Sequence, residues 1–144
     1  MSDPQPEQID ALMGAFEGFT RRFKMADAKA AAESGLNSLD FQTLLYISAN
    51  PATPLTDVAR HLDVAVTTMS SSADRLVRKG MIDRRRPPGD RRTVALEATP
   101  EGRAVAESHR VRFHRAIAWM LAALDEDERA ALVRLSEKIA RSDP

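Results

Sequence analysis

Apolar residues recur every three or four positions near both ends of the chain, which is the spacing of one face of an α-helix. The first stretch predicts a long helix, and its sequence stays compatible with a helix until Gly35. Near the other end, Thr99-Pro100 is typical of a helix start, because threonine is a good N-cap and proline suits the first helical position. Asp125 and Glu128 form a capping-box pattern for a last helix. We therefore expect long amphipathic helices on both sides of the middle region.

Three shorter helical patterns lie between these flanks. The first covers residues 39–50 and stops before a proline. In the second, Thr53 is the predicted N-cap and Pro54 the predicted first helical residue. The third covers residues 65–80 and is closed by Gly80 as its C-cap. Two short helices joined by a tight turn are thus expected before the next change of pattern.

The pattern then changes from helical spacing to strand spacing. Residues 81–86 and 93–98 have the length of strands, and the second is β-branched or alternately apolar. Pro87, Pro88 and Gly89 mark a tight connection between them. The predicted fold is mainly α with a small β-hairpin wing, a winged helix-turn-helix with long helices on either side.

Charge is distributed unevenly, although the chain carries no formal net charge, with 21 basic and 21 acidic residues. The stretch from residue 75 to residue 99 carries eight basic residues: Arg75, Arg78, Lys79, Arg84, Arg85, Arg86, Arg91 and Arg92. Only three acids, Asp83, Asp90 and Glu97, lie in the same stretch. A concentrated positive face favours a polyanion as partner, and a solvated charged surface is the alternative.

The helix over residues 65–80 has two different faces at 100° per residue. Its inward side is apolar or small. The outward side and its flanks carry hydroxyl groups and guanidinium groups, on Thr67, Thr68, Ser70, Ser71, Arg75 and Arg78. Such a helix fits the major groove, where hydroxyls bond to base edges and arginines hold phosphates. We predict that these six residues contact DNA, and a plain polar helix surface is the alternative.

The hairpin carries the second set of predicted DNA contacts, Arg84, Arg86, Asp90, Arg91 and Arg92. Arginine on a narrow, protruding tip suits an A·T-rich minor groove, where the negative potential is enhanced. Asp90 is expected to orient a neighbouring arginine through a charge-assisted hydrogen bond. The turn would then concentrate the positive charge at the tip of the hairpin.

These residues resemble the MarR family of bacterial transcription regulators. The resemblance runs in register through "DVARHLDV", "TTMSSSADRLVRKGMIDR" and "GDRRTVALEATPEG". The wing pattern of the family falls on Asp90, Arg91, Arg92, Thr99 and Gly102, and the helix pattern falls on Arg75, Leu76 and Gly80. Two positions depart from the family pattern. Asp63 stands where the turn commonly has glycine, and Ala65 stands where a serine or threonine usually caps the recognition helix.

The resemblance implies a regulator, more commonly a repressor, that binds a pseudo-palindromic operator as a homodimer. Residues 1–34 and 100–144 would be dimerisation helices, and residues 36–98 a DNA-binding lobe, within a single domain. The apolar stripes of the outer helices favour a second chain independently, because large exposed apolar patches are uncommon on monomers. A monomer whose ends pack on its own core is the alternative.

Many members of the family bind a small aromatic or anionic effector. The residues predicted to line such a pocket are Phe16, Phe19, Phe23, Tyr46, His109 and Phe113. Aromatic residues at helical spacing are also typical of an ordinary core, and that alternative stays open.

Other classes of function find little support in the sequence. Without cysteine, thiol chemistry and Cys-ligated zinc are excluded. His109 and His114 are five residues apart, so they do not share a helix face as zinc ligands would. We expect no catalytic residues, cofactor or metal, and no enzyme activity. No apolar run is long enough to span a membrane, which favours a cytoplasmic protein. A winged-helix module that binds another protein is the remaining alternative, and salt dependence of duplex binding would distinguish it.

Overall fold

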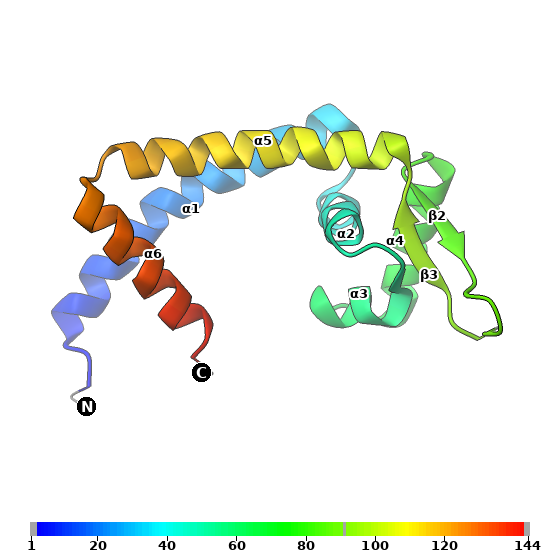
Figure 1. The fold of residues 1–144 in the computed structure, drawn as a ribbon, viewed down its shortest axis with the longest axis horizontal. Helices are drawn as coiled ribbons and strands as arrows, with labels where there is room; N and C mark the ends of the chain where they lie inside the picture. The colour runs from blue at the N-terminus through cyan, green and yellow to red at the C-terminus, as the bar shows by residue number, and fades with distance from the viewer. Residues whose placement is uncertain (1–2, 91, 143–144) are drawn as a thin grey trace. The chain divides into compact units, whose positions relative to one another are not determined.

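The structure is a computed structural model that describes residues 3–90 and 92–142, apart from the side chain of Ala26. The chain forms two compact units, Met1–Arg110 and Val111–Pro144. Figure 1 shows the order of the helices and strands along the chain.

Helix α1 (Pro6–Ser34) is the long first helix that the sequence predicts. At its start, the side chain of Gln8 accepts the backbone N–H of Gln5 at 3.0 Å. At its end, Gly35 adopts the left-handed conformation with φ 71°. Glycine takes this conformation without a steric penalty, and it closes the last turn of the helix. The helix thus covers the whole stretch that the sequence leaves compatible with a helix.

Helices α2 (Ser38–Ala49), α3 (Leu55–His61) and α4 (Val66–Arg78) form the centre of the first unit. The side chain of Asn37 caps α2 by accepting the backbone N–H of Asp40 at 2.8 Å. Helix α4 packs against both α2 and α3. This arrangement is the helix-turn-helix that the sequence predicts.

Asp63 and Ala65, the two positions that depart from the family pattern, lie in the turn before α4 and at its start. Asp63, in the turn between α3 and α4, has a positive φ of 52°. Aspartate tolerates this region better than most residues, although less well than glycine. Ala65 is the N-cap of α4 and makes no side-chain cap. At the other end of α4, Lys79 is the C-cap, one residue before the predicted Gly80. Gly80 follows it in the left-handed conformation with φ 71°.

A three-stranded antiparallel sheet follows the helices, in the order β1-β3-β2. Strands β2 (Ile82–Arg85) and β3 (Ala95–Ala98) form the predicted hairpin. Strand β1 (Thr53–Pro54) is not predicted by the sequence.

The prediction that Thr53 caps α3 and that Pro54 begins it is wrong. Thr53 pairs with Leu96 of β3, and the backbone N–H of Leu55 donates to the Val94 carbonyl at 3.1 Å. Pro54 is the N-cap, so α3 starts one residue later than predicted. Thr53 therefore belongs to a strand, although the local pattern assigned it to the start of a helix.

The core of the first unit lies where α2, α4 and the sheet meet. Phe41, Leu44 and Ile47 of α2 are buried there, together with Ile82 and Leu96 of the sheet. The inward face of α4 completes this core with Met69, Ser72, Ala73 and Leu76, all without exposed surface. The predicted inward side of α4 is therefore confirmed.

Helix α5 (Pro100–Ala122) begins with the predicted Thr99-Pro100 cap. The Thr99 hydroxyl accepts the Gly102 N–H at 3.1 Å and donates to the Gly80 carbonyl at 2.6 Å. The backbone N–H of Thr99 donates to the Met81 carbonyl at 3.0 Å. These bonds attach the start of α5 to the connection between α4 and β2.

The second unit contains the end of α5 and helix α6 (Glu126–Ala140). The predicted capping box is present, with Asp125 and Glu128 each accepting the backbone N–H of the other at 2.9 Å. The Arg129 guanidinium also donates to the Leu121 carbonyl at 2.7 Å. In the part of the chain that the structure describes, the helices are too short or too polar to cross a bilayer.

Candidate nucleic-acid interface

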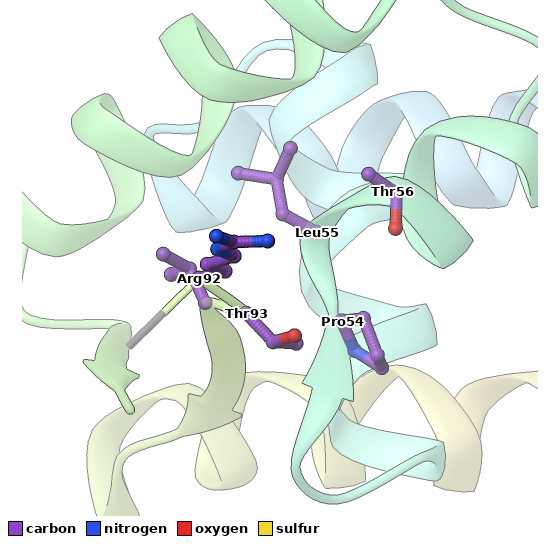
Figure 2. Close-up of a pocket in the computed structure, with 6 residues that line it drawn as sticks. Pro54, Leu55, Thr56, Arg92 and Thr93 are labelled. Atoms are coloured by element: carbon purple, nitrogen blue, oxygen red, sulfur yellow. The ribbon is translucent and has the colours of Figure 1, made fainter. Parts of the chain in front are cut away.

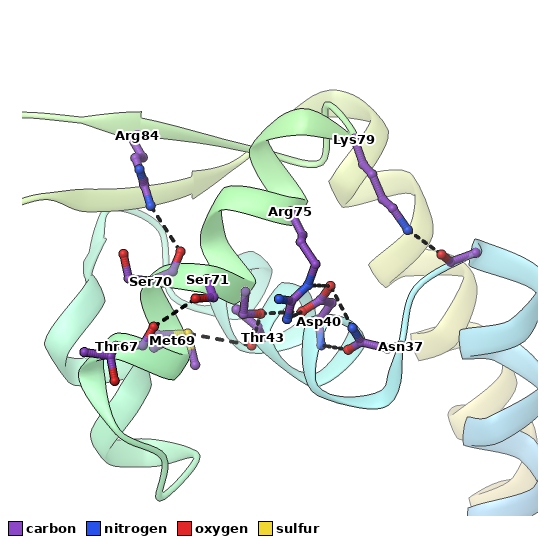
Figure 3. Close-up of polar contacts among 12 residues, drawn as sticks. Asn37, Asp40, Thr43, Thr67, Met69, Ser70, Ser71, Arg75, Lys79 and Arg84 are labelled. Atoms are coloured by element: carbon purple, nitrogen blue, oxygen red, sulfur yellow. Dashed lines mark hydrogen bonds and ion pairs between the residues drawn. The ribbon is translucent and has the colours of Figure 1, made fainter.

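The outward face of α4 carries most of the residues predicted to contact bases. Thr67, Thr68, Ser71 and Arg78 are exposed, and Ser70 is half-buried. The Ser71 hydroxyl donates to the Thr67 carbonyl at 3.2 Å, a bond that Figure 3 shows along the helix. This bond leaves the oxygen lone pairs of Ser71 able to accept a further hydrogen bond. The start of α4 thus presents short hydroxyl groups to solvent.

Arg75 points instead toward a buried carboxylate on α2. Its Nε and Nη2 atoms donate to the two Asp40 oxygens at 2.8 and 2.7 Å (Figure 3). Asp40 is only 1% exposed, and it also accepts bonds from Ser72 at 2.6 Å and Asn37 at 3.1 Å. The structure therefore gives Arg75 a role inside the fold. Its predicted phosphate contact stays a prediction.

Sequence reasoning missed Asp40, and the sequence did hold a signal for it. An acid stands in the otherwise mostly apolar stretch "LDFQTLLYI". A carboxylate is rarely buried without a partner. The partner could not be named from the sequence, because Arg75 lies 35 positions further along the chain.

The pKa of Asp40 shows how well the cluster stabilises its charge. Burial by itself would raise the pKa of this carboxyl. The hydrogen bonds from Arg75 and Ser72 and the positive charges of Arg75 and Lys79 outweigh burial, and the pKa lies below the ordinary value of 3.8. The ionised form is therefore the one that the folded chain prefers.

Asp40→Asn should change how stability depends on pH. Because the folded pKa is depressed, the charge of Asp40 stabilises the fold above the ordinary pKa and loses that effect as pH falls through the folded value. The free energy of unfolding of the variant should therefore be lower than that of the wild type at pH 6, with the gap narrowing below about pH 4. Urea unfolding at several pH values measures this gap. A gap that stays constant between pH 6 and pH 2 would contradict the assignment.

The hairpin is tied to α4 by one of its own arginines. Arg84 Nη2 lies 2.7 Å from an Asp74 oxygen. It also donates to the Ser70 carbonyl at 3.3 Å (Figure 3). These two contacts hold the wing against the recognition helix. Arg85 pairs with Glu97 at 3.0 Å, which joins the two strands of the hairpin. The predicted DNA contact of Arg84 stays a prediction.

The tip of the wing is ordered by Asp90. Its Oδ1 atom accepts the backbone N–H groups of Arg92 at 2.8 Å and Thr93 at 3.1 Å. Hydrogen bonds from the Thr93 side chain, and then from these two amides, lower the pKa of Asp90. The expected partner was an arginine side chain, whereas these contacts are with the backbone. Asp90 therefore shapes the turn, as a short acidic side chain commonly does.

Three arginines remain of the residues that the sequence predicts as wing contacts, and the structure describes two of them. Arg86 and Arg92 are exposed. Arg91 lies outside the described residues. Figure 2 shows Arg92 beside Leu55, at a pocket of 250 Å³ near the base of the wing.

The residues predicted to line an effector pocket have separate surroundings. Phe16 and Phe19 make an edge-to-face contact on exposed α1, with ring centroids 6.4 Å apart. Tyr46 stacks on His61 at 4.1 Å. His109 lies 2.6 Å from an Asp27 oxygen and contacts Phe41 edge-to-face.

Phe23, half-buried on α1, and Phe113, which belongs to the second unit, complete the predicted set. A hollow of 590 Å³ lies between α1 and α2, and Lys24, Asp27 and Phe41 are among its lining residues. None of the six predicted residues lines it. The pocket assignment therefore stays a prediction. Within the described residues, no three His, Asp or Glu side chains are grouped to hold a metal ion.

A helix-turn-helix, a second helix with an exposed hydroxyl face and an arginine-bearing hairpin together define a winged helix-turn-helix protein. Comparison with known proteins agrees. The model of the MarR family matches residues 34–93. YdgJ of Bacillus subtilis, an uncharacterised HTH-type transcriptional regulator, is 29% identical over 112 residues, which cover 76% of this chain and 67% of YdgJ.

Solved structures resemble the whole chain. RV1404 from Mycobacterium tuberculosis is 25% identical with a TM-score of 0.80, covering 100% of this chain and 99% of RV1404. FabT from Streptococcus pneumoniae, solved in complex with DNA, is 23% identical with a TM-score of 0.71, covering 95% of this chain and 96% of FabT. The chain is therefore similar to the MarR family in the sequence of residues 34–93 and in its fold. Members of this family are transcriptional regulators and not enzymes.

Proposed function

We propose that this regulator binds a specific double-stranded DNA operator as a homodimer and represses transcription. The observation that carries the proposal is the link between the wing and α4, where Arg84 reaches Asp74 and Ser70. This link holds two DNA-reading elements in one fixed relation before DNA arrives. The DNA complex of the similar protein FabT supports DNA as the partner.

In the proposed complex, α4 lies in the major groove and the wing reaches the adjacent minor groove. Thr67, Thr68, Ser70 and Ser71 would face base edges, and Arg78 would hold a phosphate. The exposed arginines of the wing would follow the narrow minor groove. A symmetric dimer would place two recognition helices about one helical turn apart on a pseudo-palindrome.

The homodimer is supported by apolar side chains that lie open on the outer helices. Residues 1–34 and 100–144 carry Ile9, Leu12, Met13, Phe16, Phe19, Met25, Val111, Phe113, Ile117, Trp119, Leu132, Val133, Leu135 and Ile139, all at least 36% exposed. Patches of this kind are uncommon on a monomer and usually mark an interface. We propose these two segments as dimerisation helices and residues 36–98 as the DNA-binding lobe.

Leu135→Asp should dissociate the proposed dimer. A carboxylate in an apolar interface would be buried without a partner, whereas on a solvated surface it would cost little. Light scattering should show the monomer mass at micromolar concentration. Ala130→Asp is the matched control, because it adds the same charge to the opposite side of α6, and it should stay dimeric. A dimeric Leu135→Asp variant would place the interface elsewhere.

A small aromatic or anionic effector is part of the proposal. The hollow between α1 and α2 supports it, because Phe41 offers an aromatic wall and Lys24 a positive charge. Such an effector would release DNA only if it bound the DNA-free conformation more tightly.

The experiment that tests the function is selection of duplexes from random DNA, followed by binding measurements at several salt concentrations. A sequence-specific dimer should enrich one pseudo-palindrome and lose affinity steeply between about 50 and 200 mM salt, because phosphate contacts release counterions. If no duplex is preferred over heparin at low salt, the proposal fails. The alternative module that binds another protein would then be favoured.

Thr67→Ala and Ser71→Ala should each change which duplex is preferred. A lost base contact reduces discrimination by about 1–3 kcal/mol at the position it reads. Affinities for the selected operator and its single-base variants measure the change. Thr56→Ala, which removes an exposed hydroxyl from α3, serves as the control and should leave the preference unchanged. An equal loss on every duplex would make Thr67 and Ser71 phosphate contacts.

A further inference from the structure

A buried carboxylate connects the centre of the fold to the recognition helix. Asp40 is on α2, and its two oxygens accept bonds from Ser72 and Arg75 of α4 at 2.6 to 2.8 Å. Figure 3 shows the Arg75 side chain of α4 reaching Asp40. Asn37, which caps α2, donates to the same carboxylate. The inference drawn from this cluster rests on the proposed function.

The other polar contacts between α2 and α4 are long: the Thr43 hydroxyl donates to Met69 Sδ at 3.8 Å and accepts from the Ser72 hydroxyl at 3.4 Å. Met69, Ala73 and Leu76 meet the core through apolar surface. Apolar burial depends on area and hardly on angle. A guanidinium fork on a carboxylate does depend on angle, because two parallel hydrogen bonds form only in one relative orientation. The cluster is therefore the contact that fixes the rotation of α4 about its own axis.

A small rotation would matter at the DNA-facing side. A helix with its side chains has a radius of about 5 Å, so a rotation of about 20° moves an outward group by about 2 Å. A hydrogen bond does not survive a shift of that size. Ser71 is the direct neighbour of Ser72, and Arg75 lies one turn further along the same helix. Whatever holds Ser72 and Arg75 therefore sets where the Ser71 and Thr67 hydroxyls point.

We propose that Asp40 is a positioning residue for sequence discrimination: by holding Ser72 and Arg75, it sets which base edges Thr67 and Ser71 face. Asp40 itself is buried and would not touch DNA. Loss of Asp40 should therefore lower the ratio of specific to non-specific affinity for DNA. Non-specific affinity comes mainly from phosphate contacts, which tolerate a small rotation of the helix.

The test is Asp40→Asn in the full-length protein. Asparagine keeps one oxygen, which can accept from the Ser72 hydroxyl and from Arg75 Nη2. Its NH2 nitrogen cannot accept from Arg75 Nε, so the guanidinium fork loses one of its two bonds and its charged partner. The probes are the duplex selected by the wild-type protein and a shuffled duplex of the same length. We expect the ratio of the two affinities to fall about 10-fold or more, with the affinity for the shuffled duplex changed less than about threefold.

Asp57→Asn is the matched control, because it removes the same charge from an exposed acid that pairs with Arg60 on α3. It should leave the ratio of affinities unchanged. The double variant Asp40→Asn/Arg75→Gln should have a ratio no lower than that of Arg75→Gln alone, since both changes break the same bond. Additive losses in the double variant would contradict positioning through Arg75.

A second variant keeps the proposal testable if Asp40→Asn does not fold. Ser72→Ala removes the bonds of the Ser72 hydroxyl to Asp40 and Thr43 and leaves the pairing of Asp40 with Arg75. It should lower the ratio about two- to fivefold. A folded Asp40→Asn or Ser72→Ala protein with the wild-type ratio overturns the inference. A wild-type protein that selects no duplex overturns the proposed function itself, so the two failures are distinguishable.

Discussion

Replacing Arg91 and Arg92 by alanine should weaken binding of the selected duplex about 100-fold or more at physiological salt. Hydrogen bonds to charged groups contribute about 1.5–3 kcal/mol each, and about 1.4 kcal/mol corresponds to a factor of ten. The geometry supports a strong effect, because Asp90 holds the turn through the Arg92 and Thr93 amides. A turn that these bonds already hold loses less conformational entropy when Arg92 binds.

The salt dependence of the same variant should also change. Each lost phosphate contact should reduce the slope of log K against log salt by about 0.9. Arg134→Ala/Lys138→Ala is the control, because it removes two exposed positive charges from α6, outside the helix-turn-helix. It should change affinity less than about twofold. If the wing variant binds as the wild type does, the wing does not reach the DNA.

Gly102→Ala should destabilise the fold strongly, because Gly102 is the glycine with the least room for a Cβ atom. A Cβ atom at Gly102 would overlap the Met81 carbonyl oxygen and lie 3.0 Å from the Leu44 side chain. That carbonyl cannot move away easily, because it accepts the Thr99 N–H, and the Met81 N–H donates to the Leu76 carbonyl at 2.9 Å. Overpacking in a rigid site costs about 1–3 kcal/mol, so we expect a loss near 3 kcal/mol in denaturant unfolding.

Gly18→Ala is the matched control for this prediction. Gly18 is exposed on α1, and an added Cβ would meet no atom within 4 Å. Alanine is a better helix former than glycine, so this variant should be more stable by about 0.5–1 kcal/mol. A Gly102→Ala protein as stable as the wild type would mean that the start of α5 is not packed against Met81.

The helices and the hairpin were predictable because their signals are local. Gly35 and Gly80 mark helix ends through a backbone conformation that glycine favours. Thr99 and Asp125 cap helices through bonds to residues only three positions away. The family resemblance was likewise predictable, because the spacing of the wing and helix motifs is a property of the sequence alone.

Other features were not predictable because they join distant parts of the chain. Strand β1 forms only when Thr53 meets Leu96, so the local helix-start signal at Thr53 was misleading. Arg75 and Arg84 were predicted as DNA contacts from their charge, and the structure pairs them with Asp40 and Asp74. The sequence shows that an arginine is present, but it does not show which carboxylate lies beside it.

The sequence by itself determined the order of the helices and the hairpin, the family resemblance and the side of α4 that faces outward, because helical period and capping act over a few residues. Only the tertiary structure decided how α4 is held, through a carboxylate 35 positions from its arginine. It also decided where α3 begins and why residue 102 is glycine. The physical reason is the same in each case: partners distant in sequence become neighbours only after the chain has folded.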